Sequence, residues 1–118
     1  MAETEAIYRV TIITRREKQE ELRVAMQEIG ITGMTVTSCT GCGVQKASVR
    51  FYRGNAKEVR LLPKVMFEIV VSEIPVETII KKAREVLCTG EIGDGKIFVE
   101  EEMRAIKIRT QEEGVKAL

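Results

Sequence analysis

Residues 89–99 read TGEIGDGKIFV, a glycine-rich stretch that lies between a helical pattern and a strand pattern. Its segment from Gly90 to Lys96 has the G-x-x-x-x-G-K spacing of a nucleotide-hydrolysing P-loop, but Ile97 stands where a Ser or Thr is needed. A P-loop also runs from a strand into a helix, whereas this stretch runs from a helix into a strand. The order excludes such a P-loop, and it predicts a glycine nest for an anion with Lys96 as a nearby cation.

The elements on either side of this stretch follow from hydrophobic spacing. Pro75 opens a helix that Gly90 closes, and its apolar face carries Val76, Ile79, Ile80, Ala83 and Leu87. Residues 96–99 (KIFV) and 64–72 (KVMFEIVVS) read as strands. Residues 105–109 (AIKIR) alternate again, which predicts a further strand with Lys107 and Arg109 on one side.

The first third of the chain repeats the alternation of strand and helix. Residues 7–14 (IYRVTIIT) are rich in β-branched side chains, and residues 33–40 (GMTVTSCT) alternate, so both predict strands. Between them, residues 16–29 predict a helix with Leu22, Ala25, Met26 and Ile29 on one face. Residues 41–62 show neither periodicity, are rich in glycine and cationic residues, and predict a long, functional loop.

The resulting order is strand, helix, strand, long loop, strand, helix, strand. This order predicts an α+β fold, a ferredoxin-like βαββαβ sandwich with both helices on one face of the sheet. The 118 residues, 44% of them apolar, suffice for one domain over residues 1–118. Its functional segments are the loop at about 41–62, the glycine stretch at about 89–96 and the C-terminal segment 104–118.

Composition excludes several classes of function. The formal net charge is +1, so no global field draws the chain to nucleic acid or to an anionic membrane. The chain has no histidine, which excludes Ser-His and Cys-His nucleophile pairs and histidine-containing metal sites. No apolar run approaches a membrane span and the first residues are not a signal peptide, so we expect a cytoplasmic protein without a bound metal.

The cysteines leave one question open. Cys39 and Cys42 have the C-x-x-C spacing of a redox pair or of half a zinc site, but the chain has no second such pair. The alternative is two thiols at the base of a loop, with Cys88 packing beside the second helix.

Six short motifs resemble the PII signal-transduction proteins, and together they span nearly the whole chain. They are GITGMTVT at 30–37, Gln45-Lys46, FYRG at 51–54, LLPKV at 61–65, TGEIGDGKIFV at 89–99 and IKIRT at 106–110. Members of that family are ferredoxin-like homotrimers that sense adenine nucleotides and carbon or nitrogen metabolites. The resemblance therefore implies a regulatory protein rather than an enzyme, and it names the loop at 41–62 the T-loop.

The resemblance also implies a nucleotide site between neighbouring chains. Gly93, Asp94, Gly95 and Lys96 would hold phosphates, and Lys107 and Arg109 would reach across from the adjacent chain. Gly33 and Thr35 would lie near the adenine and ribose. In the T-loop region, Gln45 would help to bind Mg-ATP and 2-oxoglutarate beside Lys46, and Lys64 would meet the distal carboxylate of 2-oxoglutarate.

The sequence departs from the family pattern at several of these positions. Lys57 stands where many members carry the tyrosine that receives a regulatory modification. Ser48 remains a candidate site for such a modification. Val44 stands in place of an arginine, Glu91 in place of a lysine, and Lys107 in place of an arginine. These changes weaken the set of cations expected around the phosphates, which we call the cationic cage. We therefore expect ADP or AMP, with ATP and Mg²⁺ less favoured, as a regulatory ligand rather than a tightly bound cofactor.

Two classes of function follow from these observations. The first is a regulator whose nucleotide selects a T-loop conformation, with 2-oxoglutarate or bicarbonate as a second ligand and a transporter or metabolic enzyme as its target. The second is a slow ATP-hydrolysing enzyme that uses Lys96 and Asp94, for which no clear base is present.

Overall fold

The computed structural model describes residues 6–45, 58–102 and 104–118, and for residues 43–45 and 58–60 it describes the backbone alone. Its main elements are β1 (Ile7–Arg15), α1 (Gln19–Glu28), β2 (Thr35–Gln45), β3 (Glu58–Val71), α2 (Val76–Leu87) and β4 (Lys96–Glu102). Short 3-10 turns cover Arg16–Lys18 and Gly114–Ala117. This order of elements is the predicted βαββαβ order.

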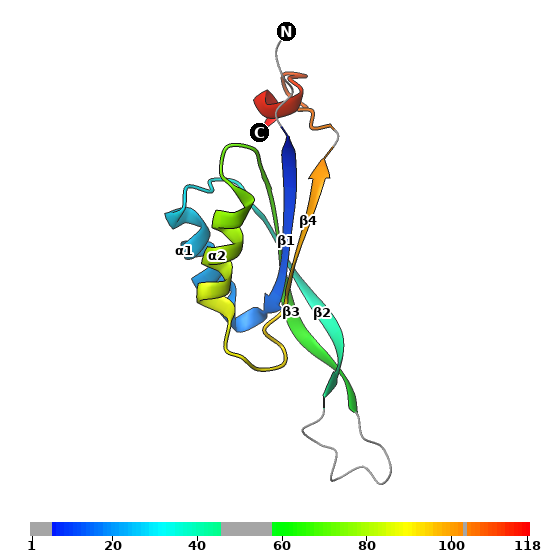
Figure 1. Ribbon diagram of the computed structural model, residues 1–118. Helices are drawn as coiled ribbons and strands as arrows, with labels where there is room; N and C mark the ends of the chain where they lie inside the picture. The colour runs from blue at the N-terminus through cyan, green and yellow to red at the C-terminus, as the bar shows by residue number, and fades with distance from the viewer. Residues whose placement is uncertain (1–5, 46–57, 103) are drawn as a thin grey trace.

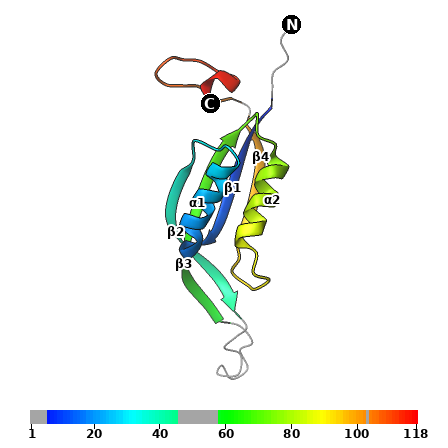
Figure 2. The same cartoon turned by 90° about the vertical axis from the view of Figure 1, so that its left-hand side faces the viewer.

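The four strands form one antiparallel sheet in the order β2-β3-β1-β4. Both helices lie on the same face of this sheet, as Figure 1 and the view turned by 90° in Figure 2 show. The α+β, ferredoxin-like fold expected from the sequence is therefore confirmed.

The core lies between the sheet and the two helices. From α1, Leu22, Ala25 and Met26 are buried, and from α2, Ile79, Ala83 and Leu87 are buried, which matches the predicted apolar faces. The central strands contribute alternate residues, namely Val10 and Ile12 from β1 and Val65, Phe67, Ile69 and Val71 from β3. Each such large side chain contributes roughly 1.5–3 kcal/mol by its burial, and together they seat the helices on one face and leave the other face open.

The loop predicted over residues 41–62 is wrong at both of its ends, because residues 41–45 belong to β2 and residues 58–62 to β3. β2 and β3 continue past the helices as a two-stranded ribbon, in which Gly41 lies opposite Leu62 and Gln45 opposite Glu58. The ribbon extends away from the helical layer in both views. Cys42 and Leu61 in this ribbon are exposed, and its sequence shows no alternation of apolar and polar residues that would indicate a strand.

The strand predicted over residues 105–109 is wrong. Ile106 forms only an isolated bridge with Glu113, and the backbone turns tightly between them, since the amide of Gln111 donates to the carbonyl of Lys107 at 2.8 Å. We call residues 104–114 the C-terminal hairpin. Gln111 allows this turn by adopting a left-handed conformation with φ of 64°, which the alternating pattern could not indicate.

Candidate functional site

The glycine stretch joins α2 to β4, as its sequence predicts, and we call residues 89–96 the phosphate loop. Gly90, Gly93 and Gly95 all have positive φ, which side chains disfavour. Gly95 is the most restricted, because a Cβ atom at this position would lie 1.9 Å from the carbonyl oxygen of Ile13. The loop backbone is therefore pressed against β1, and only glycine fits there.

Asp94 organises the phosphate loop. Its carboxylate accepts hydrogen bonds from the amides of Thr89 at 2.8 Å and Gly90 at 3.0 Å, from the Thr89 hydroxyl at 2.5 Å, and from the Arg15 guanidinium at 2.8 Å. These donors, the Thr89 hydroxyl foremost, hold the pKa of the Asp94 carboxyl well below its ordinary value. Because both carboxylate oxygens already have partners, Asp94 shapes the loop, and the glycine backbone and Lys96 remain for an anion.

A cavity of about 440 Å³ lies beside the phosphate loop. Its lining brings together Gly93, Gly95, Lys96 and Lys64, four of the residues singled out from the sequence. The remaining lining residues are Ile13, Gly41, Cys42, Leu62, Ile92 and Phe98. Two cations beside a glycine loop make this cavity suited to an anionic ligand.

Lys64 joins the ribbon to the phosphate loop. Its ammonium group donates to the carbonyl of Gly93 at 3.2 Å. The stem of the same side chain runs along Gly41, where an added Cβ would lie 2.9 Å from Lys64 Cγ. Gly41 could not be predicted as a site residue from the sequence, because the need for glycine arises only from this cross-strand approach.

The other residues expected near this cavity lie in or beside the ribbon. Gln45 is the last residue of β2, with its backbone opposite Glu58, and Val44 precedes it. Lys46, Ser48 and Lys57, which were also singled out from the sequence, lie outside the described residues.

A second cavity, of about 570 Å³, contains the residues expected near the adenine and ribose. Gly33, which precedes β2, and Thr35, the first residue of β2, line it together with Glu68 of β3. Val115 and Leu118 from the end of the chain also contribute to its wall. Thr35 lies four residues along β2 from Cys39, which pairs with Lys64, so roughly 13 Å of strand separates it from the Lys64 position.

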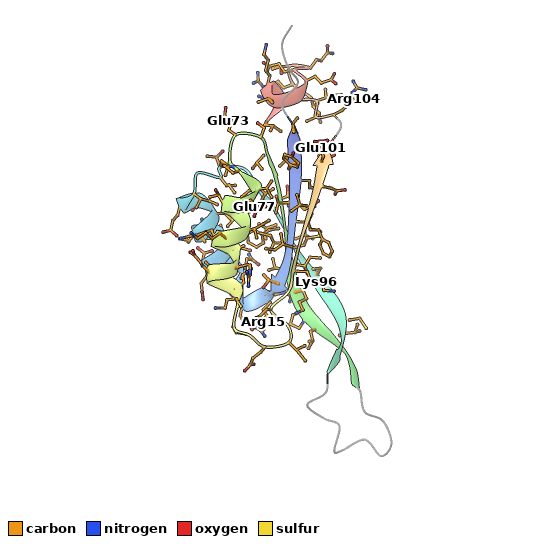
Figure 3. All side chains as sticks on the ribbon, in the orientation of Figure 1. Arg15, Glu73, Glu77, Lys96, Glu101 and Arg104 are labelled. Carbon is orange, nitrogen blue, oxygen red and sulfur yellow. The ribbon has the colours of Figure 1, made fainter. Side chains whose placement is uncertain are left out.

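Lys107 and Arg109 lie in the C-terminal hairpin, which Figure 1 shows at the end of the sheet opposite to the phosphate loop. In Figure 3, Arg15 and Lys96 lie near one end of β1 and Arg104 lies beyond the other. Lys107 approaches Glu112 at 3.9 Å, and Arg104 forms a two-pronged ion pair with Glu113 at 2.9 and 3.0 Å. Within one chain, the structure therefore does not bring Lys107 or Arg109 to the phosphate loop.

The sheet face opposite to the helices is open in a single chain. It carries apolar residues, including Ile13, Met66 and Phe98, and Phe98 is 51% exposed. Arg9 lies on the same face between Glu68, at 2.7 Å, and Glu102. The face thus combines exposed apolar surface with satisfied charges, which is typical of an interface between chains.

Cys39 and Cys42 do not form a redox pair within one chain. Cys39 pairs with Lys64 and Cys42 with Leu61, so the two thiols project from opposite faces of β2. Three residue steps along the strand place the two Cα atoms roughly 10 Å apart, whereas a disulfide requires less than about 7 Å. The pattern C-x-x-C was therefore uninformative, because its meaning depends on the secondary structure that contains it.

Neither a metal site nor a membrane helix is found among the described residues. No group of three or more potential ligands among Cys, Asp and Glu is close enough in residues 6–45, 58–102 and 104–118 to hold a metal ion. No helix in these same segments is long and apolar enough to cross a membrane.

Comparison with known proteins yields consistent matches. The family model described as "Nitrogen regulatory protein P-II" matches residues 7–112. The nitrogen regulatory PII-like protein of Bacillus subtilis (strain 168) is 44% identical over 112 residues, covering 95% of this chain and 97% of that protein. The nitrogen regulatory protein GlnK of Escherichia coli (strain K12) is 42% identical over 109 residues, covering 92% and 97%.

Solved structures give the same result. The B. subtilis GlnK-ATP complex superposes with a TM-score of 0.82 at 40% identity, covering 99% of this chain and 100% of that chain. Arabidopsis thaliana PII bound to citrate superposes with a TM-score of 0.75 at 35% identity, covering 97% and 94%.

Proposed function

Since the chain belongs to the nitrogen regulatory protein P-II family, we propose that it is a regulator that binds an adenine nucleotide in a cleft formed by two copies of the chain. The observation that carries this proposal is the cavity in which Gly93, Gly95, Lys96 and Lys64 meet. The structural likeness to a GlnK-ATP complex supports a nucleotide as the ligand.

The geometry favours a cleft between chains over a site within one chain. Lys96 begins β4, and the C-terminal hairpin follows its seven residues, which span roughly 20 Å. One triphosphate cannot bridge that length to Lys107 or Arg109 of the same chain. A neighbour that presents its hairpin to the phosphate loop supplies the missing cations, and its second cavity would receive the adenine.

A homotrimer provides such neighbours. The open sheet face exposes apolar residues, and a symmetric assembly of three chains around one axis would bury this face of every chain through the same contacts. Sedimentation or light scattering is expected to give about three chains per particle. A monomer at micromolar concentration would refute both the trimer and the shared cleft.

The ribbon is the proposed output of the site. Lys64 touches the phosphate loop through Gly93 and belongs to β3, so a ligand in the cavity meets the base of the ribbon directly. A ligand shifts the ribbon only by its differential affinity for two ribbon conformations. We infer that the T-loop, residues 41–62, to which the ribbon belongs, binds a transporter or a metabolic enzyme in one of these conformations.

The proposed preference for ADP or AMP over ATP follows from the cations that are missing from the cationic cage. Val44 carries no cation, and Glu91 adds a carboxylate to the exposed surface of the phosphate loop. ADP or AMP then matches the remaining groups better than ATP with Mg²⁺. Lys64 is the proposed cation for a second, carboxylate-type ligand such as 2-oxoglutarate or bicarbonate.

Titration calorimetry tests this function. AMP, ADP and ATP, with and without Mg²⁺, are titrated singly and then with 2-oxoglutarate or bicarbonate. Micromolar or tighter binding of at least one nucleotide is expected. Binding of none would refute the proposal, and multiple turnovers of ATP would favour the enzyme alternative.

A further inference from the structure

Arg15, the last residue of β1, reaches into the phosphate loop from the side of the sheet. One Nη atom donates to Asp94 Oδ1 at 2.8 Å, and the other donates to the carbonyl oxygen of Ile92 at 3.1 Å. Its side chain is only 22% exposed, and that of Asp94 is 21% exposed. The guanidinium therefore binds two points of the loop at once from a largely covered position.

Gly93 lies directly against this guanidinium. A Cβ atom at Gly93 would be 3.2 Å from an Nη atom of Arg15, closer than ordinary contact. The neighbouring Thr14 is buried, and its hydroxyl donates to the carbonyl oxygen of Asp94 at 2.8 Å. The end of β1 thus fixes residues 92–94 through three hydrogen bonds from two adjacent side chains.

Arg15 is the cation that balances the Asp94 carboxylate. The other donors to this carboxylate are the neutral Thr89 hydroxyl and the amides of Thr89 and Gly90. Removal of the guanidinium would leave a largely covered carboxylate without its counter-charge and free the carbonyl of Ile92. The glycine backbone of the loop would then lose the contacts that hold its shape.

The cavity beside the loop has a different set of cations. Lys64 and Lys96 are among the described residues that line this cavity, whereas Arg15 does not line it. We propose that Arg15 is a positioning residue for the proposed nucleotide site: it holds the phosphate loop in its anion-binding shape through Asp94 and Ile92, without touching the ligand. This inference rests on the proposed nucleotide binding.

Arg16 offers a matched control for the loss of charge. It follows Arg15, carries the same charge, and donates to the backbone carbonyls of Cys39 at 2.9 Å and Lys64 at 3.5 Å rather than to the loop. Arg15→Gln is expected to raise the Kd for ADP about tenfold or more, because a small misplacement of binding groups is costly, whereas Arg16→Gln raises it less than about threefold. Equal effects of the two changes would show that only net charge matters and would overturn the inference.

Two further measurements separate positioning from direct contact. Arg15→Gln and Asp94→Asn are expected to be strongly non-additive in ADP affinity, because both act on the same loop shape. Additive losses would mean that Arg15 contacts the ligand itself. Arg15→Lys keeps the charge but has no planar fork, so it is expected to restore the affinity only in part.

Hydrogen exchange gives a readout that needs no ligand. In the nucleotide-free protein, amides of residues 89–95 are expected to exchange faster in Arg15→Gln than in wild type, while amides of α1 stay unchanged. Unchanged loop exchange, or normal ADP binding by Arg15→Gln, would overturn the inference alone. A wild-type protein that binds no adenine nucleotide would overturn the proposed function as well.

Discussion

The phosphate loop is held by hydrogen bonds from side chains of β1 and β3, whereas the central side chain of the C-terminal hairpin lies almost fully exposed in the part of the chain that the structure describes. Asp94, Arg15 and Thr14 fix the loop, and Gly95 is pressed onto β1. Ile108, at the tip of the hairpin, is 97% exposed. In the proposed cleft, the loop would therefore be preorganised by folding, whereas the exposed side chains of the hairpin would gain their contacts from a neighbouring chain.

The largest expected effect comes from the most restricted glycine. Gly95→Ala places a Cβ atom 1.9 Å from a backbone oxygen at φ of 107°, so we expect a loss of about 3 kcal/mol or more in unfolding free energy and no nucleotide binding. Gly90→Ala is the control, because its φ is 84° and nothing lies within 4 Å of its Cβ. It should cost only about 1–2 kcal/mol in denaturant titrations. Similar losses for both variants would contradict the close packing of the loop.

The cations of the two regions should contribute comparably to binding. Lys96→Ala and Arg109→Ala are each expected to weaken nucleotide binding by roughly 1.5–3 kcal/mol, the usual range for a hydrogen bond to a charged group, without loss of stability. Lys81→Ala, which removes an exposed cation from α2, serves as the control. Calorimetry that finds full affinity in both variants would exclude the anion site.

The preference among nucleotides should change when cations are introduced at Val44 and Glu91, where the cationic cage lacks them. We expect wild type to bind ADP or AMP at least as tightly as Mg-ATP, and Val44→Arg with Glu91→Lys to shift the preference toward Mg-ATP by severalfold. Competition calorimetry on both forms measures the ratio. Wild-type affinity for Mg-ATP about tenfold above that for ADP would show that other groups in the assembly supply the charge.

The smallest effect is expected in the hairpin turn. Gln111 has φ of 64°, and Gln111→Gly should raise the unfolding free energy by no more than about 1 kcal/mol, because glycine adopts this conformation without the steric cost. Gly114→Ala, at φ of 77° with nothing within 4 Å of its Cβ, should change stability in the opposite direction. A large loss in Gln111→Gly would mean that the glutamine side chain has a contact of its own.

The sequence predicted the elements that bury a face and missed those that do not. Leu22, Met26 and Ile79 recur with helical spacing, so both helices were predictable from hydrophobic periodicity. In the ribbon, Cys42 and Leu61 are exposed and Gly41 and Leu62 are half-buried, and in the hairpin the sequence alternates like a strand although, among the described residues, its strand pairing is the single bridge from Ile106 to Glu113. Periodicity carries no information about either case.

For the candidate site, the glycines and Lys96 were predictable because their spacing is local. Arg15 and Gly41 were not, since each matters only through a partner far along the chain, Asp94 for Arg15 and Lys64 for Gly41. Lys107 and Arg109 were assigned to the phosphate site by family resemblance alone. The single chain separates them from it, so their role depends on the assembly.

The shared cleft can be tested directly by mixing two defective chains. Lys96→Ala and Arg109→Ala chains are unfolded together and refolded at equal concentration, and nucleotide binding is measured. If the loop of one chain meets the hairpin of its neighbour, about one cleft in four combines an intact loop with an intact hairpin and regains wild-type affinity. A mixture of Lys96→Ala with the double variant Lys96→Ala/Arg109→Ala has no intact loop and should regain none. If the first mixture also regains none, while both variants fold and assemble, the two residues do not act across a boundary between chains, which would contradict the account.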